Sequence, residues 1–344
     1  MKILGIISSP ADPASRARII QYKEPLAKEG IQLNPHYFTP LKMADPPPWA
    51  YTLKKMSGVS EWRSFDFVKS IGRIPLLFQQ TGYDLIWQNR LLQIQHYFWE
   101  KKLYKPVIFD FDDSIWMYEG QKQVDRKIAI SNMIFAGNDY LADYALKYNR
   151  NVKIVPSTIN TENLFPLGNV INKFIIGWIG SRSNFQYLEL IKPVLLDFLS
   201  QQKDAVLIIV SSEQPPQFKF DNQKIIFRKW SAEKENELIN TFTVGLMPLT
   251  DDEWTRGKCS YKLLQYMACG KPFIASPVGT NIDLLSETGL GATSYQQWLD
   301  ALLLLKNDKA TCASMASKGL DLVKEKYSCN TWAPTLLEYF QAVL

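Results

Sequence analysis

A compact apolar segment in the middle of the chain, Phe174-Ile175-Ile176-Gly177-Trp178-Ile179, decides the fold class. Such a continuous apolar run is typical of a strand that is buried on both faces of a parallel sheet. A segment with helical periodicity, residues 187–199, follows it, and another apolar run begins at residue 205. Short apolar strands that alternate with helices predict the α/β class, in which helices cover both faces of a parallel sheet.

The same alternation continues toward the C-terminus. Further strands are expected at 205–210, 224–228, 244–249 and 272–275. Further helices are expected at 231–240, 261–268, 295–306, 310–326 and 331–344. The second half of the chain therefore has the pattern of one doubly wound domain.

A similar series precedes the central strand. Strands are expected there at 2–8, 83–87, 106–110, 133–136 and 152–155, with a helix at 16–29. A polar stretch punctuated by Pro156, Pro166 and Gly168 separates the two series, so we place a linker near 157–170. We predict a Rossmann-like domain at 1–165, a second at 166–327 and a final helical segment at 328–344.

The composition fits two folded domains and argues against several classes of protein. With 344 residues, 46% hydrophobic and 21% charged, the chain is too apolar to be disordered and suits about two domains. No apolar run approaches the ~20 residues of a membrane-spanning helix, and the apolar start of the chain is too short for a signal peptide. Four cysteines without a CxxC pair and two histidines provide no zinc motif. We therefore expect a reduced, cytoplasmic protein.

Basic residues are unevenly distributed. The whole net charge of +5 arises before residue 168, and the remainder of the chain is neutral. In that first part, residues 54–105 interleave lysine and arginine with aromatic side chains. This combination suits an anionic membrane surface or an acidic glycan, and it also occurs on ordinary helices packed against a sheet. Nucleic acid is not expected as a partner, because the charge is small and no nucleic-acid-binding motif is present.

The most informative motif follows the strand expected at 244–249. It reads Thr255-Arg256-Gly257-Lys258-Cys259-Ser260-Tyr261-Lys262-Leu263-Leu264-Gln265-Tyr266-Met267-Ala268-Cys269-Gly270-Lys271-Pro272. Lys258 in the loop and Lys262 in the first helical turn can converge on the helix N-terminus, where the dipole favours an anion. Two lysines at such a position suit a diphosphate, and Gln265 on nearly the same face suits a ribose hydroxyl. A solvated basic helix start is the alternative.

Together with residues 275–281, this motif resembles the donor-site signature of GT-B glycosyltransferases of the retaining family 4 type, the group 1 glycosyl transferases. The tail at 267–272 matches the signature, whereas Gly257 and Gln265 stand where the family usually has two acidic residues. In the family the first acid usually contacts the transferred sugar and the second the ribose. The residue that contacts the transferred sugar is therefore not determined by the motif. Three acids of the same loop can take the place of the acid missing at Gly257, namely Asp251, Asp252 and Glu253.

The resemblance covers nearly the whole chain and implies the GT-B fold, with two Rossmann-like, doubly wound parallel-sheet domains facing a central cleft. It implies a hexosyltransferase-type enzyme that moves a sugar from a nucleoside-diphosphate sugar, UDP- or GDP-linked, to a glycan, lipid or other hydroxyl acceptor, with retention of configuration. The segment 328–344 would return to the first domain. No metal and no cofactor besides the donor are expected, since lysines and the helix dipole neutralise the leaving diphosphate. Glycan biosynthesis in the cytoplasm would fit, with peripheral attachment to the inner membrane face left open.

The resemblance also implies roles for residues of the second half. The diphosphate would be bound by Lys258, Lys262, Gly180, Ser181 and Arg182. The ribose and base would be bound by Gln265, Lys229 and Trp230, and the sugar by Glu253. Arg182 can equally be an exposed loop residue, and Trp230 can equally pack in the core.

In the first half, three aspartates crowd the end of the strand at 106–110. By resemblance Asp112, with Asp113 beside it, occupies the position next to the transferred sugar and is the catalytic candidate. Polar residues of the turn after the first strand are candidates for contact with the sugar, the acceptor or the donor phosphate, with a solvated helix start as the alternative. These are Ser15, Arg16 and Arg18.

Two other functions remain open. Asp110, Asp112 and Asp113 also suit a metal-dependent phosphatase or hydrolase, because clustered carboxylates can hold a divalent cation, or they can simply cap the turn. The departures at Gly257 and Gln265 also fit a non-catalytic relative that binds a nucleotide sugar without transferring it.

Overall fold

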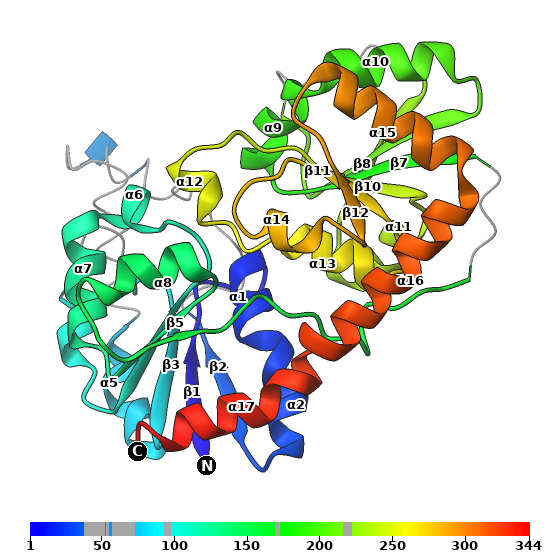
Figure 1. Ribbon diagram of the computed structural model, residues 1–344. Helices are drawn as coiled ribbons and strands as arrows, with labels where there is room; N and C mark the ends of the chain where they lie inside the picture. Colours follow the sequence, from blue (N-terminus) through cyan, green and yellow to red (C-terminus); the bar gives the residue numbers. More distant parts are fainter. Residues whose placement is uncertain (38–51, 53–54, 57–72, 93–97, 169–172, 216–221) are drawn as a thin grey trace. The chain divides into compact units, whose positions relative to one another are not determined.

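The chain forms two units, each built on its own six-stranded sheet (Figure 1). The computed structural model describes residues 1–37, 52, 55–56, 73–92, 98–168, 173–215 and 222–344. Met1–Ser157 and Trp332–Leu344 form the first unit, and Thr158–Thr331 form the second. Every strand pairing within the two sheets is parallel, so the prediction of two doubly wound, Rossmann-like sheets is confirmed.

The first sheet has the strand order β2-β1-β3-β4-β5-β6. Its strands are β1 (Lys2–Ile6), β2 (Gln32–His36), β3 (Leu85–Asn89), β4 (Val107–Phe111), β5 (Met133–Ala136) and β6 (Val152–Ile154). Its helices are α1 (Pro13–Arg18), α2 (Lys23–Lys28), α5 (Ile74–Gln79), α6 (Trp116–Glu119), α7 (Gln121–Ile130) and α8 (Asp139–Leu146), with short 3-10 turns at Ile20–Tyr22, Gln80–Gly82 and Glu100–Lys102. The chain moves from β1 outward to β2 and then crosses back to β3, so the order reverses between β1 and β3.

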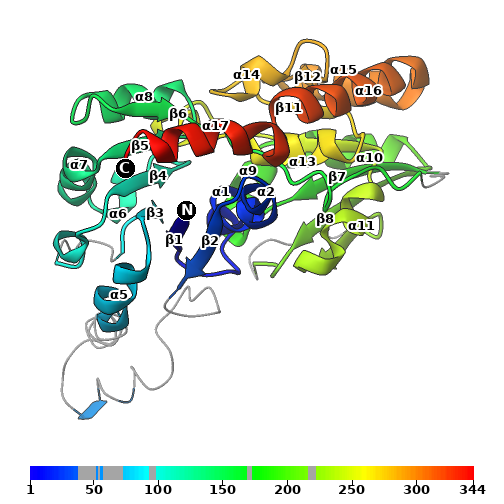
Figure 2. The same ribbon diagram turned by 90° about the horizontal axis from the view of Figure 1, so that it is seen from below.

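Aromatic packing joins the end of the chain to the first sheet. Helix α17 (Cys329–Gln341) carries Phe340, whose ring centroid lies 5.4 Å from that of Trp87 and 6.1 Å from that of Phe135. All three side chains are buried, and Figure 2 shows the part of α17 that belongs to this unit lying along the sheet. Burial of such large rings stabilises the docking of the C-terminal segment on the first unit.

The second sheet has the order β12-β11-β10-β7-β8-β9, the arrangement of a dinucleotide-binding fold. Its strands are β7 (Phe174–Ile179), β8 (Ala205–Ser211), β9 (Ile225–Lys229), β10 (Val244–Met247), β11 (Phe273–Ala275) and β12 (Gly289–Gly291). Its helices are α9 (Phe185–Leu190), α10 (Lys192–Gln201), α11 (Glu235–Asn240), α12 (Glu253–Arg256), α13 (Tyr261–Ala268), α14 (Asn281–Leu284), α15 (Tyr295–Asn307) and α16 (Lys309–Lys326), with 3-10 turns at Arg182–Asn184 and Ala232–Lys234. One core lies under α11 and α13 and the other under α10 and α15, one on each face of the sheet.

Several expected elements differ in detail. The helix expected at 187–199 is divided into α9 and α10, because Pro193 has no N–H for an α-helical hydrogen bond and therefore opens a new helix. The helix expected at 16–29 is likewise divided into α1, a 3-10 turn and α2. The edge strands β2 and β12 were not expected. β2 contains Pro35, which a central strand would not tolerate but an edge strand does.

Candidate functional site

The strand order of the second sheet reverses between β7 and β10, and two parts of the predicted donor site follow these strands. At such a reversal the crossovers leave toward opposite faces, which is why α/β folds bind ligands at the carboxyl ends of these strands. Gly180 follows β7, and the loop that leads through α12 to α13 follows β10. The topology therefore places both segments at one edge of the sheet.

Helix α13 begins at a strained residue. Its N-cap Ser260 has φ +52°, a left-handed conformation that is uncommon for residues other than glycine. The Ser260 hydroxyl donates to Asn281 Oδ1 at 2.6 Å, and the Asn281 amide donates to the Ser276 carbonyl at 2.9 Å. The loop before α13 is thereby tied to the loop after β11, so the first turn of the helix has a defined position.

The first turn of α13 meets the loop after β7. A Cβ atom built on Gly180 would lie 3.2 Å from Cε of Lys262 and 2.5 Å from the ring of Trp178. Lys262 Nζ lies 5.4 Å from the centroid of that ring, and Lys258 Nζ lies 4.8 Å from the centroid of Trp254. The faces of the rings attract the ammonium groups. The structure thus brings together Gly180 and Lys262, and the absence of a side chain at residue 180 allows this close approach.

The other two residues predicted after β7, Ser181 and Arg182, differ in how firmly they are held. Ser181 Oγ accepts from the Asn184 amide at 3.0 Å and lies 3.1 Å from Ser183 Oγ, so its hydroxyl supports the turn. Arg182 is 3.6 Å from Glu213, and about half of each side chain is exposed. Such an exposed pair contributes little to stability, so Arg182 keeps the freedom to turn toward a ligand.

Gln265 lies about one turn along α13 from Lys262 and is 4% exposed. Its side-chain amide forms no hydrogen bond with the residues that the structure describes. Its amide atoms are not among the fully buried side-chain atoms that lack a partner, so they stay accessible to solvent or to a ligand. Gln265 is therefore well suited to exchange hydrogen bonds with a ligand beside α13.

The residues predicted to bind the base occupy the end of β9. Trp230 Nε1 donates to Glu235 Oε1 at 2.8 Å, and the ring packs against the core of the unit. Lys229, the last residue of the strand, is exposed. The structure gives Trp230 a packing role, and contact of either residue with a base stays a prediction.

The acids of the loop after β10 have distinct surroundings. Asp252 caps α12, accepting the Thr255 N–H at 2.9 Å, while Thr255 Oγ1 accepts the Asp252 N–H at 3.0 Å. Asp251 pairs with the exposed Arg256 at 2.7 Å. Glu253 lies in the first turn of α12 and stays the candidate for contact with the sugar.

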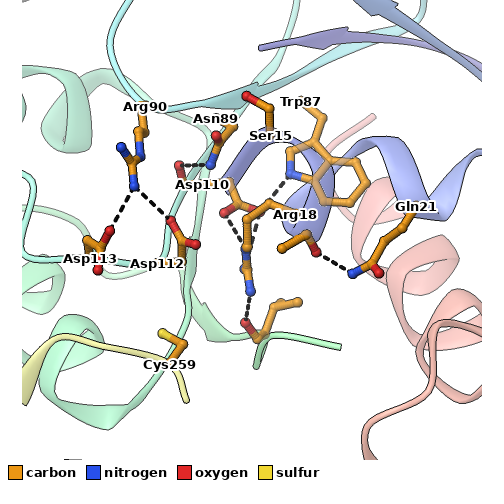
Figure 3. A network of polar contacts seen from close by, with 12 residues as sticks. Ser15, Arg18, Gln21, Trp87, Asn89, Arg90, Asp110, Asp112, Asp113 and Cys259 are labelled. Atoms are coloured by element: carbon orange, nitrogen blue, oxygen red, sulfur yellow. Dashed lines mark hydrogen bonds and ion pairs between the residues drawn. The ribbon is translucent and has the colours of Figure 1, made fainter. Parts of the chain in front are cut away.

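In the first unit, the three predicted aspartates divide into two groups (Figure 3). Asp110 is fully buried and binds Arg18 through both oxygens, at 2.8 and 3.2 Å, while Trp87 Nε1 donates to it at 2.8 Å. Arg18 also donates to the Val155 carbonyl at 2.7 Å. Asp110 and Arg18 therefore link α1 to the sheet. Arg18 is not exposed to a ligand as the sequence suggested, and the oxygens of Asp110 are not free to act as the nucleophile of a hydrolase.

Asp112 and Asp113 lie beyond the end of β4 and share a different cation. Arg90 Nη2 lies 2.8 Å from Asp113 Oδ2 and 3.5 Å from Asp112 Oδ1 (Figure 3). Burial raises the pKa of Asp112 to about 6, with Arg90 opposing the shift and Asp113 adding to it. A carboxyl group that titrates near neutral pH is suited to proton transfer or to polarising a reacting group.

Arg90 was not predicted from the sequence. It follows β3 with φ +64°, and its guanidinium carbon lies 5.9 Å from the centroid of the Tyr118 ring. The neighbouring Leu91 N–H donates to Glu119 Oε2 at 3.0 Å. Burial raises the pKa of Glu119 to about 7, and Arg90 opposes that shift too. Its place at the end of β3, beside the strand reversal of the first sheet, is the signal that identifies Arg90.

The two remaining candidates, Ser15 and Arg16, lie in the first helix after β1 and differ in their accessibility. Ser15 is fully buried, and both its N–H and its hydroxyl donate to Asp12 Oδ2, at 3.1 and 3.2 Å. Asp12 is the N-cap of α1, so Ser15 supports the helix start. Arg16 is half-buried in the same helix and is the more accessible of the two for a sugar or acceptor.

Part of the basic aromatic segment at 54–105 lies outside the described residues, including Lys54, Arg63 and Lys69. In the described part of the chain, no helix is long and apolar enough to cross a membrane. Within the same ranges, no group of three or more His, Cys, Asp and Glu side chains is placed to hold a metal ion.

Comparison with known proteins identifies the family of one domain and the fold of the chain. Residues 173–308 match the family model of the Glycosyl transferases group 1. Anabaena Alr3699/HepE, solved in complex with UDP-glucose, is 14% identical with a TM-score of 0.72, and 99% of this chain and 100% of that chain are covered. The sucrose-phosphate synthase tll1590 of Thermosynechococcus elongatus is 13% identical with a TM-score of 0.72 and coverage of 99% and 98%. A glycosyltransferase from Rickettsia africae ESF-5 is 12% identical with a TM-score of 0.65 and coverage of 99% and 98%.

Among curated protein sequences, none matches the chain. The solved structures show the fold, and the family model covers most of the second unit, including Lys258, Lys262 and Gln265. Residues 173–308 therefore form a group 1 glycosyl transferase domain, and the chain as a whole has the fold of the GT-B glycosyltransferases.

Proposed function

We propose that the enzyme transfers a sugar from a nucleoside-diphosphate sugar to a hydroxyl group of a glycan, lipid or other acceptor, with retention of configuration. The observation that carries the proposal is the close approach of Lys262 to Gly180 at the strand reversal of the second sheet. A diphosphate can approach the backbone where a helix N-terminus and an ammonium group face a glycine. Lys262 in the first turn of α13 and Gly180 provide this combination.

Transfer breaks the bond between the anomeric carbon and the diphosphate, and the diphosphate leaves with the bonding electrons. The acceptor hydroxyl oxygen forms the new bond to the anomeric carbon, and its proton passes to the leaving diphosphate. Negative charge therefore grows on the leaving group. Lys262 and Lys258 would stabilise that charge, with Arg182 as a further cation. The site would need no cofactor other than the donor itself.

UDP-sugars are the first donors to test. Anabaena HepE, which shares the fold over nearly the whole chain, was solved with UDP and with UDP-glucose. Gln265 would exchange hydrogen bonds with the ribose, because its side chain forms no hydrogen bond with the described residues and lies about one turn along α13 from Lys262. GDP-sugars are the second donor class to compare.

In the first unit, Asp112 would position or polarise the reacting sugar and acceptor, with Asp113 and Arg90 holding its loop. Its raised pKa still leaves the carboxylate mostly ionised at neutral pH. Arg16 would contact the acceptor, since its side chain is only half-buried.

The proposal is tested by thermal shift with UDP, GDP, ADP and CMP, followed by their sugar conjugates. A selective shift that is lost in Lys262→Ala and kept in Lys203→Ala, an exposed lysine of the same unit, would support the donor site. A shift that Lys262→Ala leaves intact would contradict it.

Product analysis separates the remaining functions. Transfer with the anomeric configuration unchanged, read by NMR, supports retention. Binding without any transfer would indicate a non-catalytic relative. Hydrolysis of phosphate esters that is abolished by EDTA would favour the metal-dependent alternative.

A further inference from the structure

One surface of the first unit carries exposed apolar side chains next to lysines. It is formed by α5, cyan in Figure 1, and by the segment 98–105. We call it the basic apolar face and define it by Ile74, Phe78, Phe98, Lys101, Lys102, Tyr104 and Lys105. The exposed fractions are 45% for Ile74, 72% for Phe78, 61% for Phe98 and 58% for Tyr104, and the grouping of such side chains on two adjoining segments is the informative feature.

The two segments are fastened to each other. Gln80, which follows α5 and is fully buried, donates to the Lys102 carbonyl at 3.1 Å and accepts the Tyr104 N–H at 3.0 Å. Leu76 of α5 and Trp99 belong to one buried apolar cluster beneath them. The exposed side chains of both segments are therefore held in one region of the surface.

The exposed charges of these two segments are all positive. Glu100 is the acid of the segment 98–105, and it is buried in an ion pair with Lys127 at 3.0 Å. Lys101 and Lys102 are exposed. Lys102 Nζ lies 5.2 Å from the centroid of the Phe98 ring, so an aromatic ring and a cation share one site. The charge that these two segments themselves present to solvent is therefore positive.

We propose that the basic apolar face binds the surface of an anionic lipid bilayer. Phe78 and Phe98 would enter the boundary between headgroups and acyl chains, and the lysines would contact headgroup phosphates. Apolar and cationic groups act together in this way, because burial of the rings adds to the attraction of the lysines for the surface. The inference does not depend on the identity of the donor or on the catalytic role of Asp112.

The test is flotation of the full-length protein with vesicles of phosphatidylcholine alone or of phosphatidylcholine mixed with phosphatidylglycerol. We expect binding to the anionic vesicles, weakened by salt. A Lys101→Glu/Lys102→Glu variant should lower the partition coefficient about 20-fold or more, and Phe78→Ser should lower it about five-fold or more.

Matched controls come from the C-terminal end of α8 in the same unit, where Leu146, the following Lys147 and Asp143 are exposed. Leu146→Ser and Lys147→Glu should leave vesicle binding unchanged, and all variants should keep the circular dichroism spectrum and melting temperature of the wild type, which shows that the fold is intact.

Equal binding to both kinds of vesicle, no binding to either, or equal losses in the α8 controls would overturn the proposal. Absence of vesicle binding together with capture of an acidic protein would assign the face to a protein partner instead. A failed UDP experiment would leave this test unaffected, because vesicle flotation does not require a donor.

Discussion

Arg90 Nη2 lies 2.8 Å from Oδ2 of Asp113, so a residue at the end of β3 holds the loop that follows β4. Burial disfavours the charge on Arg90, but Tyr118, Asp112 and other nearby acids outweigh it and raise the pKa of the guanidinium. Arg90 therefore stays charged and sets the electrostatic surroundings of Asp112. This relation makes Arg90 a positioning residue for the proposed reaction.

Replacement of Arg90 should move the pH profile of the enzyme. In Arg90→Met, the attraction that lowers the pKa of Asp112 is lost, so the acidic limb of kcat should shift to higher pH, while Arg90→Lys should restore part of the original profile. The profile is measured with saturating donor and acceptor, and Arg150→Met provides an exposed arginine control. An unchanged pH profile in Arg90→Met would show that Arg90 does not influence the titration of the catalytic group.

Asp112→Asn should reduce kcat roughly 100-fold, as expected for the loss of a group that acts on the reacting atoms. It should also remove the limb near pH 6, because the carboxyl group whose pKa is about 6 no longer exists. Asp113→Asn is the matched comparison and should lower kcat less. Equal effects of the two substitutions would argue that the loop matters rather than Asp112 itself.

Lys262→Ala should lower kcat about 100- to 1,000-fold, the range found for one donor that stabilises transition-state charge. The melting temperature should hardly change, since the Lys262 side chain is partly exposed. The measurements are steady-state kinetics and a thermal melt. Full activity in Lys262→Ala would sink the assignment of the diphosphate site.

Breaking the buried Arg18–Asp110 pair should destabilise the first unit. Arg18→Met leaves the fully buried Asp110 without its cation, at a cost of about 3–5 kcal/mol in the free energy of unfolding. Urea denaturation measures the loss. Arg256→Met, which breaks an exposed pair with Asp251, serves as the control and should hardly change the unfolding curve.

The free energy of unfolding should fall as the pH rises, because two buried carboxyl groups have raised pKa values. The pKa values of Asp112 and Glu119 are raised by burial to about 6 and about 7, so the folded state binds protons more tightly than the unfolded state. The contribution of both groups to stability is therefore present at low pH and falls as the pH rises from about 4 to about 7. Glu119→Gln should flatten this fall in denaturation curves measured across that interval. An unchanged slope would show that Glu119 is not strained in the folded protein.

Much of the fold can be predicted because parallel strands buried on both faces are continuous apolar runs. β4 and β7 are of this kind, and both lie within a residue of their expected positions. β2 and β12 are different. β2 contains a proline, and β12 is only Gly-Leu-Gly, so each is recognisable only from its pairing with a neighbouring strand.

The local pattern also indicates which residues lie at strand ends and at the start of α13, and it therefore predicts Lys262 and the aspartates at the end of β4 as site candidates. It says nothing about which aspartate is paired. Asp110 and Asp112 are two residues apart, yet their partners differ. Arg18 of α1 pairs with Asp110 inside the protein. Asp112 lies near Arg90, which also pairs with Asp113, and its pKa is raised. Those partners lie 92 and 22 residues away in the chain. Charge and pKa depend on distance and burial, and these are established only when α1, β3 and β4 pack together.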